Sequence, residues 1–360
     1  MSFIARPKSD RGFRPALVAL EGRALMSVSP SRLHHVAGVV HAAATTRANA
    51  TITPITSPTG SSQAGGYRFL NFDGPGAGTN ANTGTNINGI ANDGVTVGLT
   101  IGNTPGNNNF LARPRSNRFA TTTNIAGAAG ASAFGVNNSG TVVGSDGINS
   151  AFTLSRGTVR TFLPNGASAA TAFGINDRGV IVGQETAGQV TTGFLRVPGR
   201  NARTPAQDIL VTGPGGLILV NVQGINNQGL AVGFYSNGST THGLIANQRS
   251  ALNGTITSTA VADPTIPAVA GESGATFVFS QILGVNDRGI AVGYYGDSTG
   301  SQHGFLYNTK TAQYSFLDDP NVAFNNGVEV TQITGITNSG ELTGFYSDAT
   351  GAFHGFVAYR

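Results

Sequence analysis

Three histidines, His242, His303 and His354, are the first residues of this 360-residue chain that could perform chemistry, and each is followed by Gly and an apolar residue. Histidine exchanges protons near neutral pH and is a common metal ligand, so these side chains are candidates for acid–base catalysis or binding. Each occupies the same place in a repeated segment. An enzyme needs unrepeated polar groups that converge in one pocket, so a recurring position favours a shared packing or turn hydrogen bond. A ring of imidazoles around a channel is the alternative.

The acidic residues also recur in turns. Asp93, Asp177 and Asp287 lie in turns where a carboxylate can accept hydrogen bonds from the backbone of its own turn. Calcium binding is the alternative, but it requires several convergent oxygens, and three of the six turns have Asn or Ser instead. Asp318-Asp319-Pro320 and Asp73-Gly74-Pro75-Gly76 form a related pair of turns, which favours a structural role over the carboxylate pair of a glycoside hydrolase. We expect no metal ligand set and no cofactor.

Tyrosines that follow a V-G or T-G dipeptide are the most plausible recognition surface: Tyr235, Tyr294, Tyr295 and Tyr346. Tyrosine offers a flat apolar face and a hydroxyl group, which suits contact with a saccharide or a protein. With the three histidines of the repeats, these exposed rings are the predicted binding residues. The alternative is that the rings pack between adjacent repeats.

Several reaction classes lose their support from composition. The chain has no Cys, which excludes disulfides, thiol catalysis and cysteine-ligated zinc, and no Trp, which the Asp-box of sialidase-like proteins carries. Seven basic and two acidic side chains lie in residues 1–50, which leaves 14 basic and 15 acidic side chains in the rest. A near-neutral repeat region argues against nucleic acid as a partner. We also expect no transmembrane helix, because no apolar run reaches about 18 residues.

Six copies of a ten-residue block organise the chain from residue 67 onward. The blocks are GIANDGVTVG from Gly89, GVNNSGTVVG from Gly135, GINDRGVIVG from Gly174, GINNQGLAVG from Gly224, GVNDRGIAVG from Gly284 and GITNSGELTG from Gly335. Their starts are 46, 39, 50, 60 and 51 residues apart. These intervals lie near the length of a four-stranded propeller blade, and the longest indicates an insertion around residues 262–273.

Each block predicts a β-hairpin. In the third block, Ile175 ends one strand, turn formers follow, and Val180 begins the return strand. The Gly in the turn supplies a positive φ, and the closing Gly183 leaves room for neighbouring backbone or a large side chain. The predicted structural turn residues are Asn137, Gly140, Asn176, Gly179, Asn226, Gly229, Asn286 and Gly289.

Apolar strands are expected on both sides of each block. Those before it include residues 67–72, 159–163 and 314–317, and those after it include residues 151–154, 193–197, 242–245, 303–307 and 354–359. The expected unit is therefore one strand, the two block strands and a final strand. Six such units, each unable to bury both faces alone, predict an all-β, six-bladed β-propeller-like domain. A β-solenoid and two packed sheets are the alternatives.

The first 66 residues are a separate region. Residues 1–41 form a basic leader, expected to be disordered, and the Ala/Thr/Ser/Pro/Gly-rich residues 42–66 form a flexible linker to the repeat domain of residues 67–360. The segment FRPALVALEGRALMS at residues 13–27 resembles an N-terminal motif of surface and secreted planctomycete proteins. The resemblance implies export, and Val18 and Met26 depart from the motif.

The repeats themselves resemble a known type. The block followed by H-G-F-L-Y is similar to the extracellular HAF repeats, named for a His-Ala-Phe triplet, with Gly in place of Ala here. Residues 284–307 and 335–359 match best, and the first three copies lack the His. The resemblance covers nearly the whole region after the linker. It implies a surface or secreted location and no established activity.

The expected function is that of an extracellular or cell-surface scaffold that binds a protein or polysaccharide through loops at one end of the ring. We expect no catalytic activity. The alternative is a secreted propeller-type hydrolase or lyase that acts on polysaccharide. Unrepeated Asp, Glu, Arg and His side chains at the central channel would favour the enzyme, and a channel lined by Thr and Asn would favour the scaffold.

Overall fold

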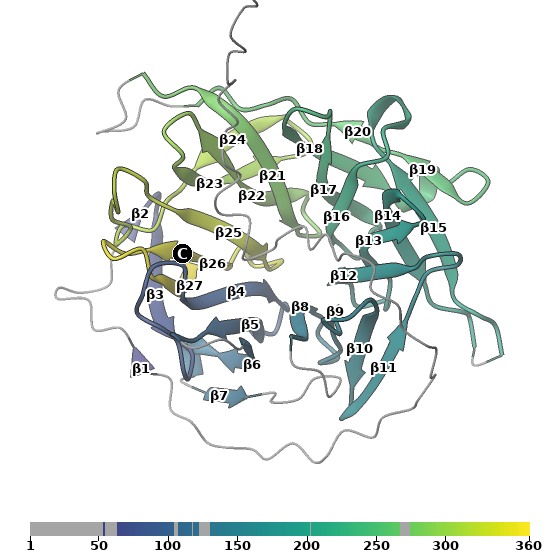
Figure 1. The fold of residues 1–360 in the computed structure, drawn as a ribbon, viewed down its shortest axis with the longest axis horizontal. Helices are drawn as coiled ribbons and strands as arrows, with labels where there is room; N and C mark the ends of the chain where they lie inside the picture. The colour runs from purple at the N-terminus through teal and green to yellow at the C-terminus, as the bar shows by residue number, and fades with distance from the viewer. Residues whose placement is uncertain are drawn as a thin grey trace, which may run out of the picture. The chain divides into compact units, whose positions relative to one another are not determined.

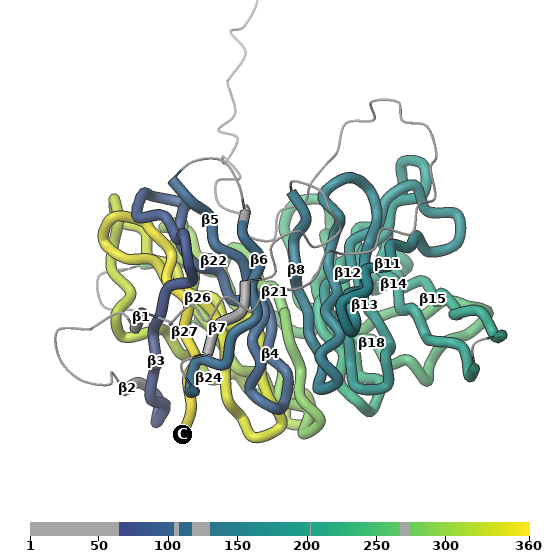
Figure 2. Tube along the Cα trace, turned by 90° about the horizontal axis from the view of Figure 1, so that it is seen from below, coloured from purple at the N-terminus to yellow at the C-terminus, as the bar shows by residue number. Residues whose placement is uncertain are grey.

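Six antiparallel sheets stand around a common axis in the repeat domain, as the sequence predicts, and a single parallel bridge between Phe353 and Gly84 connects the sixth to the first (Figure 1). The structure, a computed structural model, describes residues 53–54, 63–103, 107–116, 118–121, 130–201, 203–266 and 274–360. Seen from the side, the long strands run roughly along the axis (Figure 2). None of the helices in these ranges is long and apolar enough to cross a membrane.

Each sheet, or blade, has four main strands, and the first lines the axis. Blade 1 consists of β4 (Gly84–Ile90), β5 (Thr96–Ile101), β6 (Asn107–Arg113) and β7 (Arg118–Thr121). Blade 2 consists of β8 (Ser132–Val136), β9 (Val142–Ser145), β10 (Ala151–Ser155) and β11 (Thr158–Phe162). Blade 3 consists of β12 (Ala169–Ile175), β13 (Ile181–Ala187), β14 (Val190–Val197) and β15 (Gln207–Thr212). Blade 4 consists of β16 (Val220–Ile225), β17 (Leu230–Ser236), β18 (Thr241–Asn247) and β20 (Thr259–Ala260). Blade 5 consists of β21 (Phe277–Val285), β22 (Ile290–Asp297), β23 (Gln302–Asn308) and β24 (Gln313–Phe316). Blade 6 consists of β25 (Thr331–Ile336), β26 (Leu342–Ser347), β27 (Phe353–Tyr359) and β3 (Tyr67–Asp73). Short 3-10 helices are η1 (Pro114–Ser116), η3 (Pro214–Gly216) and η4 (Gln248–Ser250).

The boundaries of the blades differ from the predicted unit by one strand. The strand expected to open a unit pairs instead with the last strand of the preceding unit, as β11 pairs with β10 and β24 with β23. The first long strand of the chain, β3, accordingly pairs with β27 and completes blade 6. The two ends of the repeat region therefore share one sheet, which closes the ring. A β-solenoid does not describe this arrangement.

The linker contains more strand than its composition predicts. Two short strands, β1 (Thr53–Pro54) and β2 (Gln63–Ala64), pair with the two ends of β3. These four residues of the expected flexible linker are therefore strand. The basic leader of residues 1–41 lies outside the described residues.

Each block forms the predicted hairpin because the backbones of its third residue and of its turn Gly hydrogen-bond across the turn. In blade 3, Gly179 N donates to Asn176 O at 3.0 Å and Asn176 N donates to Val180 O at 3.1 Å. The glycine at this place has a positive φ in all six blocks, between 74° and 92°. A side chain at that position would strain the backbone, so the turn glycine follows from the geometry.

The closing Gly of each block leaves room for the backbone of the first strand and, in four blades, for a large side chain on the third strand, as predicted for Gly183. A Cβ added to Gly183 would lie 2.7 Å from the Phe194 ring and 2.0 Å from Thr171 O. Gly183 and Phe194 are cross-strand partners. In the other five blades the partner of the closing Gly is a fully buried side chain, Phe110, Phe152, Leu244, Phe305 or Phe356. An added Cβ would meet this ring in blades 1, 2, 3 and 6, and would meet a carbonyl oxygen of the first strand in all six blades.

The opening Gly of each block lets neighbouring blades approach at the axis. A Cβ on Gly224 would lie 2.9 Å from the Cα of Gly284, and one on Gly284 would lie 3.2 Å from the Cα of Gly335. Gly135 and Gly174 are related in the same way. The six first strands thus meet backbone to backbone around the axis, an approach that only glycine permits.

The hydrophobic core is divided among the junctions between blades. Six clusters of buried side chains each combine residues from two adjacent blades: blades 1 and 2, 2 and 3, 3 and 4, 4 and 5, 5 and 6, and 6 and 1. At the last of these junctions Phe72 and Val357 of blade 6 pack with Ile87 and Phe110 of blade 1. Every blade therefore buries its faces against its two neighbours, as the repeats require.

The longest block interval contains two additions. After β18 the chain crosses to blade 3, where β19 (Thr255–Thr257) pairs in parallel with β15, and it then returns to form β20. The connection to β21 follows, and its residues 267–273 lie outside the described part. The insertion thus begins earlier than the predicted residues 262–273.

We expect Gly224→Ala to destabilise the domain by about 2–3 kcal/mol, because the new methyl group would meet the backbone of blade 5. Urea unfolding followed by tyrosine fluorescence measures the change. Gly238→Ala is the control: Gly238 has φ 94° and no atom within 4 Å of an added Cβ, so only the strain of a left-handed alanine, about 1 kcal/mol, should remain. Equal losses in the two variants would contradict the close approach at the axis.

Candidate functional site

The axis of the ring is narrow and is lined by repeated residues. Two cavities of about 70 and 80 Å³ lie along it, well below the roughly 300 Å³ or more of a site for a drug-sized ligand. The opening glycines form one layer of the wall, Ile or Val forms the next, and the Asn and Asp side chains of the block turns surround the mouth. Among the described residues that line these cavities there is no His, Lys, Arg or Glu.

The third residue of a block links its turn to the next blade. Asn226 Oδ1 accepts hydrogen bonds from Gln228 N at 3.0 Å and Leu230 N at 2.9 Å within its own turn. Its Nδ2 donates to Asn286 O of the next blade at 3.0 Å. The same bridge to the next blade starts from Asn137, Asn176 and Asn286. The predicted turn asparagines therefore hold the turn and the ring together.

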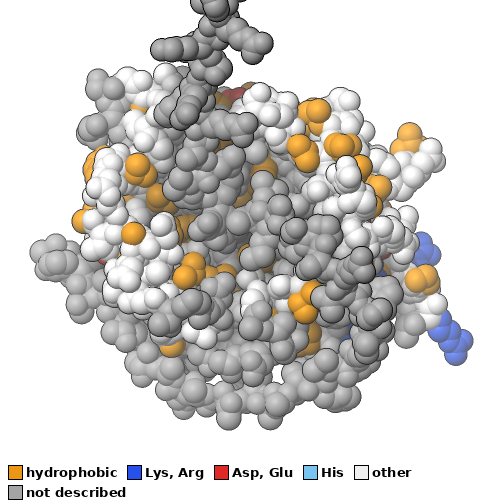
Figure 3. Space-filling view, in the orientation of Figure 1, with side chains coloured by type: hydrophobic (Ala, Val, Ile, Leu, Met, Phe, Trp, Pro, Cys, Tyr) orange, Lys and Arg blue, Asp and Glu red, His pale blue; other side chains and the backbone are white. Residues whose placement is uncertain are grey.

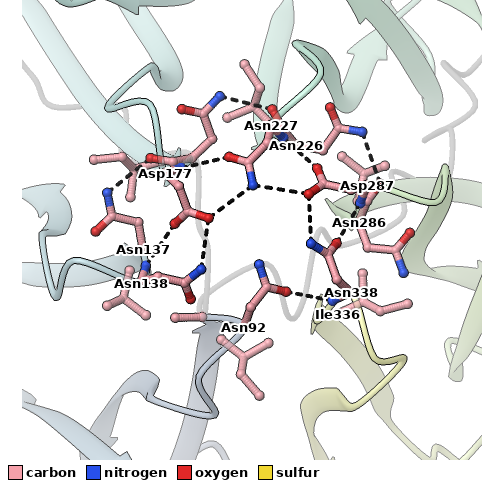
Figure 4. Close-up of a pocket in the computed structure, with 17 residues that line it drawn as sticks. Asn92, Asn137, Asn138, Asp177, Asn226, Asn227, Asn286, Asp287, Ile336 and Asn338 are labelled. Carbon is pink, nitrogen blue, oxygen red and sulfur yellow. Dashed lines mark hydrogen bonds between the residues drawn. The ribbon is translucent and has the colours of Figure 1, made fainter.

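The fourth residue of each block completes a second circle, the turn ring, which consists of Asn92, Asn138, Asp177, Asn227, Asp287 and Asn338 (Figure 4). The side-chain oxygen of each member accepts a backbone N–H from the preceding blade, at distances of 2.6–3.2 Å. The bond from Asn338 N to Asn92 Oδ1 joins blade 6 to blade 1. Six hydrogen bonds thus run around the mouth without a break.

The two carboxylates of the turn ring lie between amides. Asp177 Oδ2 accepts from Nδ2 of Asn138 at 2.8 Å and from Nδ2 of Asn227 at 3.0 Å. Asp287 Oδ2 accepts from Nδ2 of Asn227 at 3.1 Å and from Nδ2 of Asn338 at 2.7 Å. Their oxygens therefore connect three blades each, and they are occupied by donors that belong to the scaffold.

This geometry corrects the predicted role of the block aspartates. Asp177 and Asp287 accept from neighbouring blades, whereas the Asn before each of them caps the turn. Asp93 occupies the next position, because Asn92 is the member of the turn ring in blade 1. Only Asp93 accepts from its own turn, from Val95 N at 3.2 Å.

The predicted tyrosines and histidines come together in pairs on blades 4, 5 and 6. Tyr235 pairs across the strands with His242, and the corresponding pairs are Tyr295 with His303 and Tyr346 with His354. The ring centroids are 5.6, 5.1 and 5.3 Å apart with tilted planes. Each pair lies near the connection end of the ring, the end that carries the turns between second and third strands and the connections between blades.

Each histidine also meets an acidic residue at the end of the fourth strand of its blade or just beyond it. Nδ1 of His242 lies 2.9 Å from Asp263, that of His303 lies 2.9 Å from Asp318, and that of His354 lies 3.1 Å from Asp73. Nε2 faces the turn between the second and third strands, where the residue is Asn237, Asp297 or Asp348. We call each set of four residues a His module.

The blade 6 module favours a charged imidazole. Burial opposes the charge on His354, but hydrogen bonds and charges from Asp73, and then from Asp348, more than offset it and raise its pKa. Burial also opposes ionisation of Asp348, yet hydrogen bonds from Thr350, His354 and the turn backbone lower its pKa. In blade 4 an amide, Asn237 Nδ2, faces Nε2 of His242 at 2.9 Å instead.

The predicted recognition surface of exposed tyrosines is wrong. Tyr294, Tyr295 and Tyr346 are 3%, 1% and 3% exposed, because adjacent blades cover both faces of each sheet. Tyr235 is half-buried. Tyr294 faces away from the module, and its hydroxyl donates to Gln281 Oε1 at 2.9 Å. These aromatic side chains instead pack between the blades, which is the alternative stated for them. The recurring histidines share a hydrogen bond, as their repeated position predicts.

Sequence reasoning missed Asp263 and Glu329, and also Asn237, Asp297 and Asp348, which face Nε2 of the three histidines. An Asp-Pro dipeptide after the fourth strand, Asp263-Pro264, resembles Asp319-Pro320 and could have marked Asp263. Glu329 precedes the first strand of blade 6 and lies 3.8 Å from His303 of blade 5. No repeated signal marks it.

Comparisons with known proteins give no family. No protein-family model matches the chain, and no curated protein matches it. It is similar to virginiamycin B lyase from Staphylococcus aureus, with a TM-score of 0.41 and 11% identity over 82% of this chain and all of that one. It is also similar to puromycin hydrolase, with a TM-score of 0.39 and 10% identity over 74% of this chain, and spans about half, 51%, of that protein. For YCF48 bound to D1 peptide the TM-score is 0.37, with 12% identity over 76% of this chain and 82% of that one.

We expect Asn226→Ala to lower the free energy of unfolding by about 2–3 kcal/mol, because the change removes two turn bonds and one bridge between blades. Asn226→Thr is the matched variant. Thr337 stands at this place in blade 6 and accepts Glu341 N at 3.0 Å, so Thr should keep a turn bond and lose the bridge, at a cost of about 1 kcal/mol. If both variants unfold alike in urea, the bridge has no measurable role.

We expect Asp348→Asn to reduce the pH dependence of stability. The raised pKa of His354 means that its charged form stabilises the fold fully below the unfolded value of about 6.5, and that this contribution is lost as the pH rises through the folded value. The variant should be less stable than the wild type at pH 5.5, and the difference should shrink at pH 9. Urea unfolding at both pH values measures it.

The reciprocal change, Asn237→Asp, gives blade 4 the same residues as blade 6 and should add pH dependence of the same sign. A stability difference between Asp348→Asn and the wild type that stays constant from pH 5.5 to pH 9 would contradict the role of the second carboxylate.

Proposed function

We propose that the protein is a non-enzymatic scaffold whose rigid ring presents loops to a protein partner. The observation that supports it best is the lining of the axis. Its polar residues occupy repeated positions, and the turn ring uses its carboxylates to join blades. Catalysis would require unrepeated acid, base or nucleophile groups in a pocket of sufficient size, and the described axis offers two small cavities lined mainly by Gly, Ile, Val and Asn.

The connection end of the ring is where we place the binding surface. Leu217, Ile218 and Leu219 follow one another in the connection from blade 3 to blade 4 and are 39%, 46% and 49% exposed. Val278 and Phe324, at 43% each, lie in or beside other connections at this end. Contiguous exposed apolar side chains are typical of protein interaction sites. Figure 3 shows on one face how hydrophobic side chains lie among largely uncharged surface.

A protein partner fits these residues better than a polysaccharide. Saccharide recognition uses exposed aromatic faces, and the tyrosines that could have supplied them are mostly buried. Four of the five exposed groups named at the connection end are aliphatic, which suits contact with apolar side chains of another protein. The proposal retains the expected export of the chain and its HAF-like character, which rest on the sequence patterns of residues 13–27 and of the repeats.

The test is affinity capture with the full chain from an extract and culture medium of the source organism. Wild-type protein is compared with a variant in which Leu217, Ile218 and Leu219 are all replaced by Ser. A partner should be retained by the wild type and lost, by tenfold or more, from the variant. The hydrogen bonds that these three residues make to neighbouring strands and turns come from their backbones. The substitutions leave the backbone in place, so the fold should persist.

Leu252→Ser is the control, because Leu252 is 74% exposed and lies away from the connection end, between β18 and β19. It should retain the partner. Equal capture by the triple variant would contradict the proposed surface, and binding to a glycan array without any protein partner would favour the polysaccharide instead.

A further inference from the structure

The His module of blade 5 differs from the other two by an additional carboxylate. His303 Nδ1 lies 2.9 Å from Asp318 Oδ2 and 3.8 Å from Glu329 Oε1. One ligand atom of each of these three residues lies within 4.8 Å of the other two. The side chains of His303 and Glu329 are 1% and 9% exposed, whereas that of Asp318 is 29% exposed. The cluster is therefore buried on two sides and open to solvent at Asp318.

A fourth acidic group points at the same imidazole. Asp297 Oδ2 lies 3.8 Å from His303 Nε2, and the Asp297 side chain is 1% exposed. Its Oδ1 accepts hydrogen bonds from its own turn, but Oδ2 has no hydrogen-bond partner. Three carboxyl groups thus surround one imidazole in a largely buried place. Burial of carboxylate charge is costly unless a cation compensates it.

The additional carboxylate is absent at the corresponding place in blade 6. Gln302 N of blade 5 donates to Glu329 O at 2.9 Å, and Phe353 N of blade 6 donates to Thr83 O at 2.7 Å in the same way. Thr83 therefore stands where blade 5 has Glu329. The His354 module has carboxylates at both ring nitrogens, but it lacks the third ligand that makes a cluster.

We propose that His303, Asp318 and Glu329 form a binding site for a divalent transition-metal ion such as Zn²⁺. Imidazole nitrogen and carboxylate oxygen are ligands that Zn²⁺ accepts, and three protein ligands leave one position for water. Tetrahedral Zn²⁺ places its ligand atoms about 3.4 Å apart, which small rotations of these side chains achieve. The metal joins blade 5, the connection after it and the first residues of blade 6.

Asp297 lies on the side of the His303 imidazole opposite to the proposed metal. When Nδ1 binds the metal, its proton leaves and the remaining ring proton is at Nε2, beside Asp297 Oδ2. A carboxylate that accepts the second N–H of a metal-bound histidine fixes the ring and raises its basicity. The Asp297 carboxyl group, 3.8 Å from Nε2, is placed to orient the imidazole in this way.

The experiment uses untagged full-length chain, freed of metal with EDTA, and measures Zn²⁺ binding by isothermal titration calorimetry at pH 7.5. The background carries His34→Ala, His35→Ala and His41→Ala, because these leader histidines could bind Zn²⁺ themselves. We expect one site, and a thermal midpoint that rises with added Zn²⁺. Glu329→Gln, which keeps the shape of the side chain, should weaken binding at least tenfold and abolish the thermal shift. Asp318→Asn should act in the same direction.

Two matched variants separate the site from general effects. Glu341→Gln removes a glutamate from the block turn of blade 6, and His242→Asn removes the equivalent imidazole of blade 4. Both should bind Zn²⁺ within twofold of the parent. The proposal is overturned if the parent shows no site at 100 µM Zn²⁺, or if Glu329→Gln binds as the parent does. It is overturned equally if Ca²⁺ binds more tightly than Zn²⁺ and His303→Asn leaves Zn²⁺ affinity unchanged, because the imidazole would then not be a ligand.

Discussion

The approach of six first strands around one axis is the constraint on which the rest of this structure depends. Their opening glycines bring backbones within contact distance, as Gly224 meets Gly284 and Gly284 meets Gly335. A wider axis would separate the asparagine bridges and the turn ring, and would open the six apolar clusters between blades. The block is therefore a unit of assembly as much as a local hairpin: one glycine sets the spacing, an asparagine bonds to the next blade, and another glycine leaves room for the backbone of the first strand.

Local features could be predicted from the sequence and long-range ones could not. The turn at Asn176 to Gly179 depends on neighbouring residues, so its type follows from them. The blade that a fourth strand joins does not follow from neighbouring residues. A strand such as β24 has the same apolar pattern whether it pairs with the preceding blade or with the following one. Burial of Tyr294 and Tyr295 together was hidden for another reason. Alternation normally distinguishes a covered face from an exposed one, but a ring of blades covers both faces.

The His modules show the same limit in chemical terms. His303 and Asp318 are 15 residues apart, whereas His354 meets Asp73 across 281 residues, because β3 completes blade 6. Repetition correctly indicated a shared structural contact for the three imidazoles. It also concealed their differences, because the surrounding Asn237, Asp297, Asp348 and Glu329 decide whether a module holds an amide, a charge pair or a surplus of carboxylates.

Because β3 pairs with β27, the order in which the strands become available affects how this domain folds. β3 lies ahead of blade 1 in the chain and β27 lies after blade 5, so blade 6 and its junction with blade 1 can form only once β27 is available. Contacts of such sequence separation are slow to form and expose strand edges meanwhile. Until β27 pairs with β3, the ring stays open at blade 6 and β27 keeps an unpaired edge.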